Sequence, residues 1–150
     1  AARAAAEIAA KRGWKVRYVA MNVRQDLPLC RALAAETGGE AIAAPEETGA
    51  LTRLFASARF TVSMRLHALT LSYLALTPAF GVDGDGRIAA FAKECGLPYR
   101  AAAETGDMTA AMEAAPEAEI PGVAARNERL AAGRAALTRA LCAPGKEKNV

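Results

Sequence analysis

The sequence predicts an α/β domain in which a parallel β-sheet lies between two layers of helices. Short runs rich in β-branched and apolar residues alternate along the chain with amphipathic segments of about 10–15 residues. Several of the amphipathic segments end at a glycine, the residue most often found just past the end of a helix. Strands this short, separated by helices, are joined by right-handed crossovers, which make the strands parallel and cover both faces of the sheet.

The first half of the chain supplies three helices and two strands. Residues 1–12 are alanine-rich and stop at Gly13, which predicts a helix, and KVRYVAM at 15–21 is typical of a strand. Asp26 then caps a helix that ends at Gly38-Gly39. AIAA at 41–44 predicts a weak strand. A third helix is expected to open at Pro45, with Glu46 and Glu47 in its first turn.

The second half continues the same alternation. FTVS at 60–63 predicts a strand and LHALTLSYLAL at 66–76 a helix, and PAFGV at 78–82 predicts the next strand. The loop DGDG leads into a helix, RIAAFAKECG, at 87–96. The whole pattern is that of a Rossmann-like α/β/α half. It lacks the G-x-G-x-x-G signature, so we expect no dinucleotide site and no cofactor.

The C-terminal part divides into three pieces. Residues 101–122 are alanine-rich and contain two prolines, which predicts a short helix and a linker. We expect residues 1–122 to form the Rossmann-like domain and 123–142 to form an amphipathic closing helix of that domain. This helix carries its solvated arginines at Arg126, Arg129, Arg134 and Arg139. Residues 143–150 are predicted to form a flexible tail.

Composition narrows the classes of function. A chain of 150 residues with 53% hydrophobic content can bury one core, and 5% aromatic content with a dispersed net charge of +3 argues against a nucleic-acid partner. Three widely spaced cysteines fit neither a disulfide framework nor a metal site. We therefore expect a reducing, cytoplasmic location. No apolar run reaches the ~20 residues of a membrane span, and no signal peptide is recognisable.

The segment VSMRLHAL, residues 62–69, is the strongest functional signal. It is a strand-to-helix junction, and ligands of open parallel sheets bind beyond the carboxyl ends of the strands. Free amides at the helix start attract anions there, Arg65 offers a bidentate fork, and His67 can transfer a proton near neutral pH. Composition alone favours a simpler interpretation, in which His67 hydrogen-bonds a neighbouring loop and Arg65 pairs with a local acid.

These residues resemble a known family. MRLHAL, followed by PAFGV and by the helix start DGRIAAF, is similar to the second half of the polysaccharide pyruvyl transferases, whose hallmark is G-M-R-L-H-A/S-L. The resemblance runs from Gln25 to Phe91. Ser63 stands where the family has glycine, Gly84 where it has tyrosine and Gly86 where it has proline. The family fold implies one half of a two-lobed, GT-B-like enzyme.

The resemblance implies roles for four residues. Arg65 and His67 match the motif directly, which implies that Arg65 binds the donor and His67 supplies or relays a proton. Asp85 and Arg87 fall at the family's Asp and Lys positions, which implies a catalytic Asp85 and a substrate-binding Arg87. From the residues themselves, Asp85 between two glycines is equally typical of a turn, and Arg87 is equally typical of a solvated helix start. Asp26 has the family's loop position and also suits a helix cap.

The family activity implies phosphoenolpyruvate as donor and a polysaccharide or lipid-linked sugar as acceptor, with no metal. Because the chain begins at Ala1 directly in a helical pattern, we expect a fragment that lacks an N-terminal acceptor lobe. Such a fragment would be inactive alone and would self-associate through its uncovered surface. Two alternatives remain. One is the nucleotide-sugar-binding half of a glycosyltransferase or epimerase. The other is a degenerate, non-catalytic association module.

Overall fold

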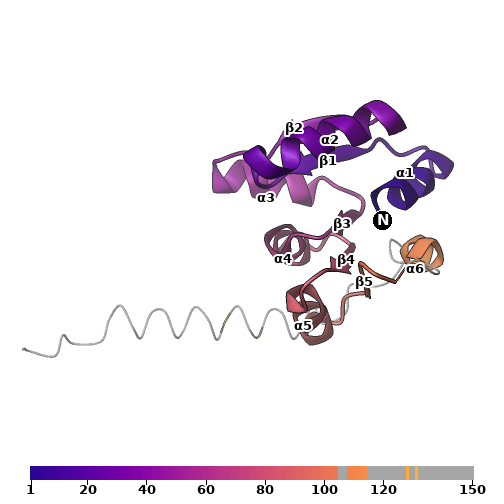
Figure 1. Ribbon diagram of the computed structural model, residues 1–150. Helices are drawn as coiled ribbons and strands as arrows, with labels where there is room; N and C mark the ends of the chain where they lie inside the picture. Colours follow the sequence, from indigo (N-terminus) through magenta and orange to yellow (C-terminus); the bar gives the residue numbers. More distant parts are fainter. Residues whose placement is uncertain (105–107, 115–127, 129–130, 132–150) are drawn as a thin grey trace, which may run out of the picture.

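The computed structural model describes residues 1–104, 108–114, 128 and 131, and it is an α/β domain with parallel strands (Figure 1). Its helices are α1 (Ala2–Lys11), α2 (Val23–Thr37), α3 (Thr48–Ala56), α4 (Leu66–Leu74), α5 (Arg87–Cys95) and α6 (Met108–Ala114). Its strands are β1 (Arg17–Ala20), β2 (Glu40–Ala43), β3 (Thr61–Ser63), β4 (Ala79–Asp83) and β5 (Tyr99–Ala101). Strands and helices alternate from β1 to α5, as predicted, and the arrangement agrees with a Rossmann-like fold.

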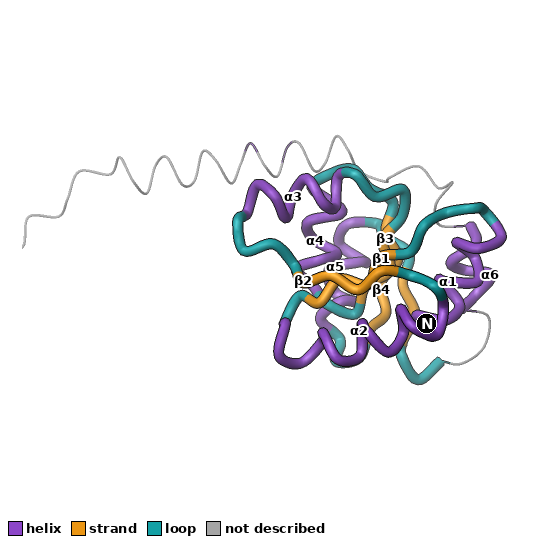
Figure 2. The backbone as a smooth tube through the Cα atoms, turned by 90° about the horizontal axis from the view of Figure 1, so that it is seen from above, coloured by secondary structure: helices purple, strands orange, loops and turns teal. Residues whose placement is uncertain are grey.

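The strands form two small sheets rather than one. β1 pairs with β2, and β3, β4 and β5 pair in that order, with every pair parallel. Figure 2 shows α2 on one side of β1 and β2 and α3 on the other. The chain passes from β1 into α2 and from β3 into α4, and the ion pair between Arg65 and Asp26 shows that the starts of these two helices lie close together.

The core is built on both faces of β4. On one face, Ala79 packs with side chains of α4 and α5, among them Leu69 and Ile88. On the other face, Phe80 and Val82 pack with helices α1 and α6 through Ile8 and Met112. Four of the five residues of β4 are buried, and no charged side chain interrupts them before Asp83. A strand buried on both faces reads as a continuous apolar run, which is why PAFGV was recognisable in the sequence.

Two predicted helix starts were wrong, one by four residues and the other by three. The prediction that Asp26 caps the second helix is not met, because Asn22 is the N-cap and accepts a hydrogen bond from the Gln25 amide. Asp26 lies one turn inside, where its carboxylate accepts the Asn22 amide at 2.8 Å, so the two side chains cap reciprocally. Pro45 does not open α3; Glu47 caps that helix by accepting the amides of Gly49 and Ala50.

The region after α5 holds one strand that the sequence pattern missed. β5 is only three residues long and pairs with β4 through Gly81, Val82 and Asp83. The short helix predicted within 101–122 is present as α6. The predicted closing helix at 123–142, with Arg126, Arg129, Arg134 and Arg139, and the tail at 143–150 fall almost entirely outside the described residues. Within the described part of the chain, no helix is long and apolar enough to cross a membrane.

We predict that Gly81→Ala destabilises the domain because the middle of β4 has no room for a methyl group. A Cβ atom at Gly81 would lie 2.6 Å from Cγ2 of the buried Ile88 and 3.3 Å from Cβ of Tyr99. Overpacking of this kind costs about 1–3 kcal/mol. Gly84→Ala is the matched control, since nothing lies within 4 Å of a Cβ there. Equal urea midpoints for the two variants would contradict this packing.

Candidate functional site

The junction between β3 and α4 is fixed by a serine hydroxyl. Ser63 is buried at the end of β3, and its Oγ accepts the Arg65 amide at 2.9 Å and donates to the Arg65 carbonyl at 3.0 Å. Arg65 has extended backbone (φ −108°, ψ 120°) and is the N-cap residue of α4. Ser63, which replaces the glycine of the resembled motif, thus holds the backbone of Arg65 at the helix start.

The Arg65 side chain is oriented by two residues of α2. Its Nη2 donates to Asp26 Oδ1 and, at 3.3 Å, to Gln25 Oε1. The guanidinium is 44% exposed and the Asp26 side chain 19% exposed, so this ion pair is partly shielded from water. Both contacts use Nη2, and no described residue accepts from Nε or Nη1. Three of the five N–H donors therefore remain for a ligand.

Helix α4 begins without a side-chain cap. The starts of α2, α3 and α5 are each satisfied by a side chain, namely Asn22, Glu47 and Asp83. In the described part of the chain, no side chain accepts from the amides of Leu66, His67 or Ala68. Open amides and the positive end of the helix dipole therefore face the region beside the Arg65 guanidinium.

The structure places His67 in the first turn of α4, exposed, two residues from Arg65. Among the described residues, its ring neither donates nor accepts a hydrogen bond. The simpler interpretation, in which His67 hydrogen-bonds a neighbouring loop, thus has no partner in the described chain. The equally simple interpretation of Arg65 as an ion-pair partner does have one, since Asp26 contacts it.

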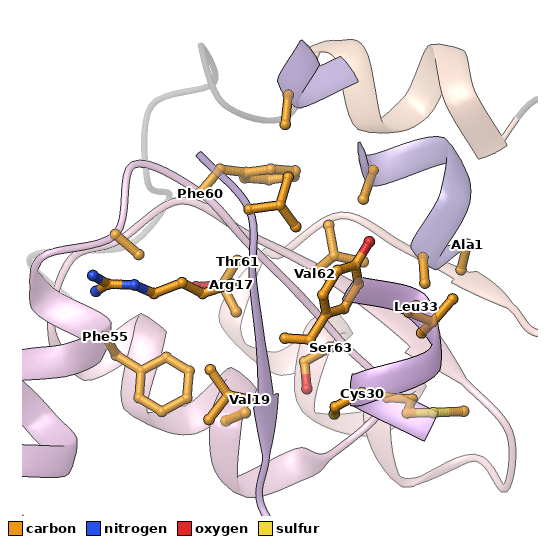
Figure 3. Close-up of a pocket in the computed structure, with 18 of the residues that line it drawn as sticks. Ala1, Arg17, Val19, Cys30, Leu33, Phe55, Phe60, Thr61, Val62 and Ser63 are labelled. Atoms are coloured by element: carbon orange, nitrogen blue, oxygen red, sulfur yellow. The ribbon is translucent and has the colours of Figure 1, made fainter. Parts of the chain in front are cut away.

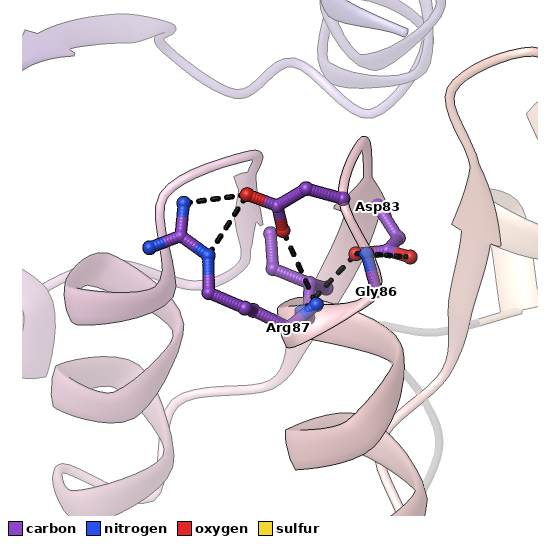
Figure 4. A network of polar contacts seen from close by, with 5 residues as sticks. Asp83, Gly86 and Arg87 are labelled. Atoms are coloured by element: carbon purple, nitrogen blue, oxygen red, sulfur yellow. Dashed lines mark hydrogen bonds and ion pairs between the residues drawn. The ribbon is translucent and has the colours of Figure 1, made fainter.

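Asp85, in the loop between β4 and α5, contacts Arg87, the first residue of α5, and Figure 4 shows the polar contacts around Arg87. Arg87 Nε donates to Asp85 Oδ2 at 2.8 Å, and the Arg87 amide donates to Oδ1 at 3.2 Å. The hydrogen bonds from Arg87 lower the pKa of Asp85, and the same pair raises the pKa of Arg87. A carboxylate stabilised in its charged form is a weaker base, so this pairing disfavours general-base chemistry at Asp85 in this arrangement.

Asp83 is a residue that the sequence analysis missed. It ends β4, and its carboxylate accepts the amides of Gly86 at 3.0 Å and Ile88 at 3.1 Å. Gly86 has φ +87°, a left-handed conformation that glycine adopts without strain. An aspartate three residues before this glycine, at the start of a helical pattern, is the signal that could have found the cap. Asp83 already satisfies the start of α5.

The four predicted site residues thus form two pairs on neighbouring loops. Arg65 and His67 follow β3, whereas Asp85 and Arg87 follow β4, and β3 and β4 are adjacent parallel strands. No hydrogen bond or ion pair between described residues joins one pair to the other. The fold brings both pairs to the carboxyl edge of one sheet. The helix start beside Arg65 and His67 has no side-chain cap, whereas carboxylates accept the amides at the start of α5.

A largely apolar cavity of about 640 Å³ opens beside this site (Figure 3). It lies between β1 and β3, and its wall includes Val19, Val62 and Phe55. Arg65 and Asp26 also line it. Asp85, Arg87 and His67 are not part of its lining.

Comparisons add no family assignment. No protein-family model, no curated protein and no solved structure matches the chain. Among the described side chains, no group of three or more His, Cys, Asp or Glu residues could hold a metal ion. The fold and the junction together define an α/β protein with a candidate anion-binding site at the carboxyl edge of its parallel strands.

We predict that Asp26→Asn removes a pH-dependent part of the stability. Burial alone would raise the pKa of Asp26, but hydrogen bonds from Arg65 and the Asn22 amide, with the Arg65 charge, hold it below its usual 3.8. A carboxylate whose pKa is lower when folded stabilises the fold above its unfolded pKa and loses that effect as pH falls through the folded pKa.

The variant should therefore be less stable than the parent protein by about 1 kcal/mol at pH 7. The difference should shrink as the pH falls from about 5 to below 3. Chemical denaturation at each pH measures it, and because only the difference is read, the other carboxylates cancel. A difference that stays constant from pH 7 to pH 2 would show that Asp26 is not stabilised by Arg65.

Proposed function

We propose that the chain is the donor-binding half of a GT-B-like pyruvyl transferase, which moves a pyruvyl group from phosphoenolpyruvate to a sugar diol as a ketal. The observation that carries the proposal is the β3–α4 junction. Arg65 is held by Asp26 with three N–H donors unused, the amides of α4 lack a cap, and His67 is exposed without a described partner. This combination suits a small dianionic ligand that must be protonated.

The proposed chemistry assigns a separate task to each group. Arg65 and the first amides of α4 hold the phosphate or the carboxylate of phosphoenolpyruvate. His67, in its protonated form, gives a proton to the methylene carbon, which becomes a methyl group and leaves the adjacent carbon cationic. One sugar hydroxyl attacks that carbon, phosphate leaves, and a second hydroxyl closes the ketal. The hydroxyl protons return to the base form of His67 or to water.

The roles proposed for Asp85 and Arg87 need a rearrangement. In the structure Nε and Nη2 of Arg87 donate to Asp85, so a carboxylate lies beside this guanidinium and repels an incoming anion until the ion pair opens. The Arg87 side chain is 75% exposed and the Asp85 side chain 53%, and water screens an exposed ion pair of this kind so that it contributes little to stability. A dianionic ligand can therefore compete for Arg87 at small cost.

A thermal-shift comparison separates the proposal from its two alternatives. A ligand that binds only the folded state raises the melting temperature by mass action. Stabilisation by phosphoenolpyruvate but not by nucleoside diphosphate sugars supports the donor-binding half of a pyruvyl transferase. The reverse result supports the nucleotide-sugar-binding half of a glycosyltransferase or epimerase. No shift with either ligand supports a non-catalytic association module.

We predict that Arg65→Lys weakens phosphoenolpyruvate binding about 10-fold although the charge is kept. A lysine replaces the planar fork by a point charge, and a charge-assisted hydrogen bond is worth ~1.5–3 kcal/mol. Arg31→Lys, at an exposed position of α2, is the control that changes the same group elsewhere. Titration calorimetry measures both. Equal affinities for the parent protein and Arg65→Lys would remove Arg65 from the site.

We predict that His67→Gln lowers pyruvyl transfer about 10²–10⁴-fold in a polypeptide that carries both lobes, the usual magnitude of general acid–base catalysis. Its melting temperature and donor affinity should change little, because no described residue bonds to the ring. Ketal formation and phosphate release are measured alongside thermal unfolding. If turnover stays normal while the melting temperature falls, His67 has a structural role and the catalytic assignment is wrong.

A further inference from the structure

Strands β1 and β3 each have an edge that no described strand pairs with. The Val16 and Ala20 carbonyls accept hydrogen bonds from β2, so the alternating main-chain groups of Arg17 and Val19 point away from β2. By the same alternation, Thr61 donates toward β4, and the main-chain groups of Val62 point away from β4. No described strand pairs with either of these edges.

These two open edges border the same cavity. The cavity of about 640 Å³ is lined by Arg17, Tyr18 and Val19 of β1 and by Thr61, Val62 and Ser63 of β3. In Figure 3 the labelled residues of both strands descend in the same order, from Arg17 to Val19 and from Phe60 to Ser63. The ion pair between Arg65 and Asp26 connects the segments that follow the two strands, so their carboxyl ends lie together. The cavity thus separates two parallel strands.

The walls above and below the cavity are apolar. Helix α1 contributes Ile8, α2 contributes Leu33, and α3 contributes Phe55. A strand between β1 and β3 would be covered on both faces by such helix side chains. A strand buried in this way consists of apolar, mainly β-branched residues without alternation. Its length follows from its neighbours, since β1 and β3 have four and three residues.

Helix α1 indicates where such a strand comes from. Ala1, Ala2 and Ala5 line the cavity, so the beginning of α1 lies beside it. Helix α1 leads through Trp14 and Lys15 into β1, which makes it a suitable crossover between β1 and a parallel strand next to β1. The turn between a strand and the following helix is commonly only about 2–6 residues long. Because the first residues of α1 line the cavity, a turn of that length could connect a strand in the cavity to α1.

We propose that the cavity between β1 and β3 receives a parallel β-strand of apolar residues that leads directly into α1, joining the two small sheets into one six-stranded sheet with the order β2-β1-strand-β3-β4-β5. The inserted strand would hydrogen-bond Arg17 and Val19 on one side and Val62 on the other. Its carboxyl end would lie beside Arg65. The inference is independent of the proposed function, since it depends on strand edges and not on ligand chemistry.

The test adds the strand. A five-residue Val/Ile strand and a three-residue glycine-containing turn are fused ahead of Ala1, and amide hydrogen exchange is measured by NMR. The amides of Val19 and Val62 should slow on the order of 100-fold relative to the unfused chain, as expected for newly formed sheet hydrogen bonds. Tyr18 and Thr61, whose amides already face β2 and β4, are internal controls. A fusion with proline at alternate strand positions, which lacks those donors, should give no slowing.

The other outcomes overturn the proposal. Fast exchange at Val19 and Val62 in the Val/Ile fusion would mean that the cavity between β1 and β3 does not accept a strand. Slow exchange of both in the unfused chain at every concentration would mean that the two edges are already paired within the chain, either with each other or with another of its segments. Slow exchange that appears only as the unfused chain is concentrated would identify a second copy as the occupant. If the fusion precipitates, the same strand added as a lysine-flanked peptide in trans must slow the same two amides, and failure to do so would overturn the proposal.

Discussion

The parallel pairing of every strand is the constraint on which the rest of the structure depends. A parallel strand cannot be followed by a tight turn, so each connection is a helix that carries the chain back across the sheet. Within each described sheet the strands consequently end at one edge, and the helices that follow them begin there. The described strands, none longer than five residues, thereby place the loops after β1, β3 and β4 within one region, although β1 and β4 end 63 positions apart, at Ala20 and Asp83.

The chemistry at this edge differs from loop to loop because of which helix starts are capped. Asp83 and Asp85 place two carboxylates at the start of α5, so that loop already carries its own anions. At α4 the cap position is an arginine, and the nearest carboxylate, Asp26, belongs to another helix and binds the guanidinium rather than the amides. An incoming anion meets positive potential at α4 and compensated charge at α5. The resemblance to the pyruvyl transferases gives both loops roles, but the electrostatics favour the first.

The sequence predicted the described elements well where periodicity was strong. The alternation of strands and helices from β1 to α5 and the apolar run of β4 follow directly from burial, which residue types report. Helix starts at Asp26 and Pro45 were wrong because capping depends on which side chain reaches which amide, and Asn22 and Glu47 reach them first. β5 was missed because a strand of three residues is too short to show the alternation or the apolar run by which strands are predicted. The Arg65–Asp26 contact spans 39 positions, and no local pattern encodes it.

The Arg65–Asp26 pair belongs to the candidate site and also lines the cavity between β1 and β3. It crosses from α4, which follows β3, to α2, which follows β1, at the carboxyl end of the cavity between these strands. A strand filling that cavity would lead into α1, whose first residues line the same cavity as the pair, and the turn between a parallel strand and its helix presents main-chain amides to ligands. Anion binding and completion of the sheet would therefore both involve the residues around Arg65 and Asp26. Because the Arg65 side chain is held by Gln25 and Asp26 of α2, it would lie beside both a bound anion and the carboxyl end of the added strand.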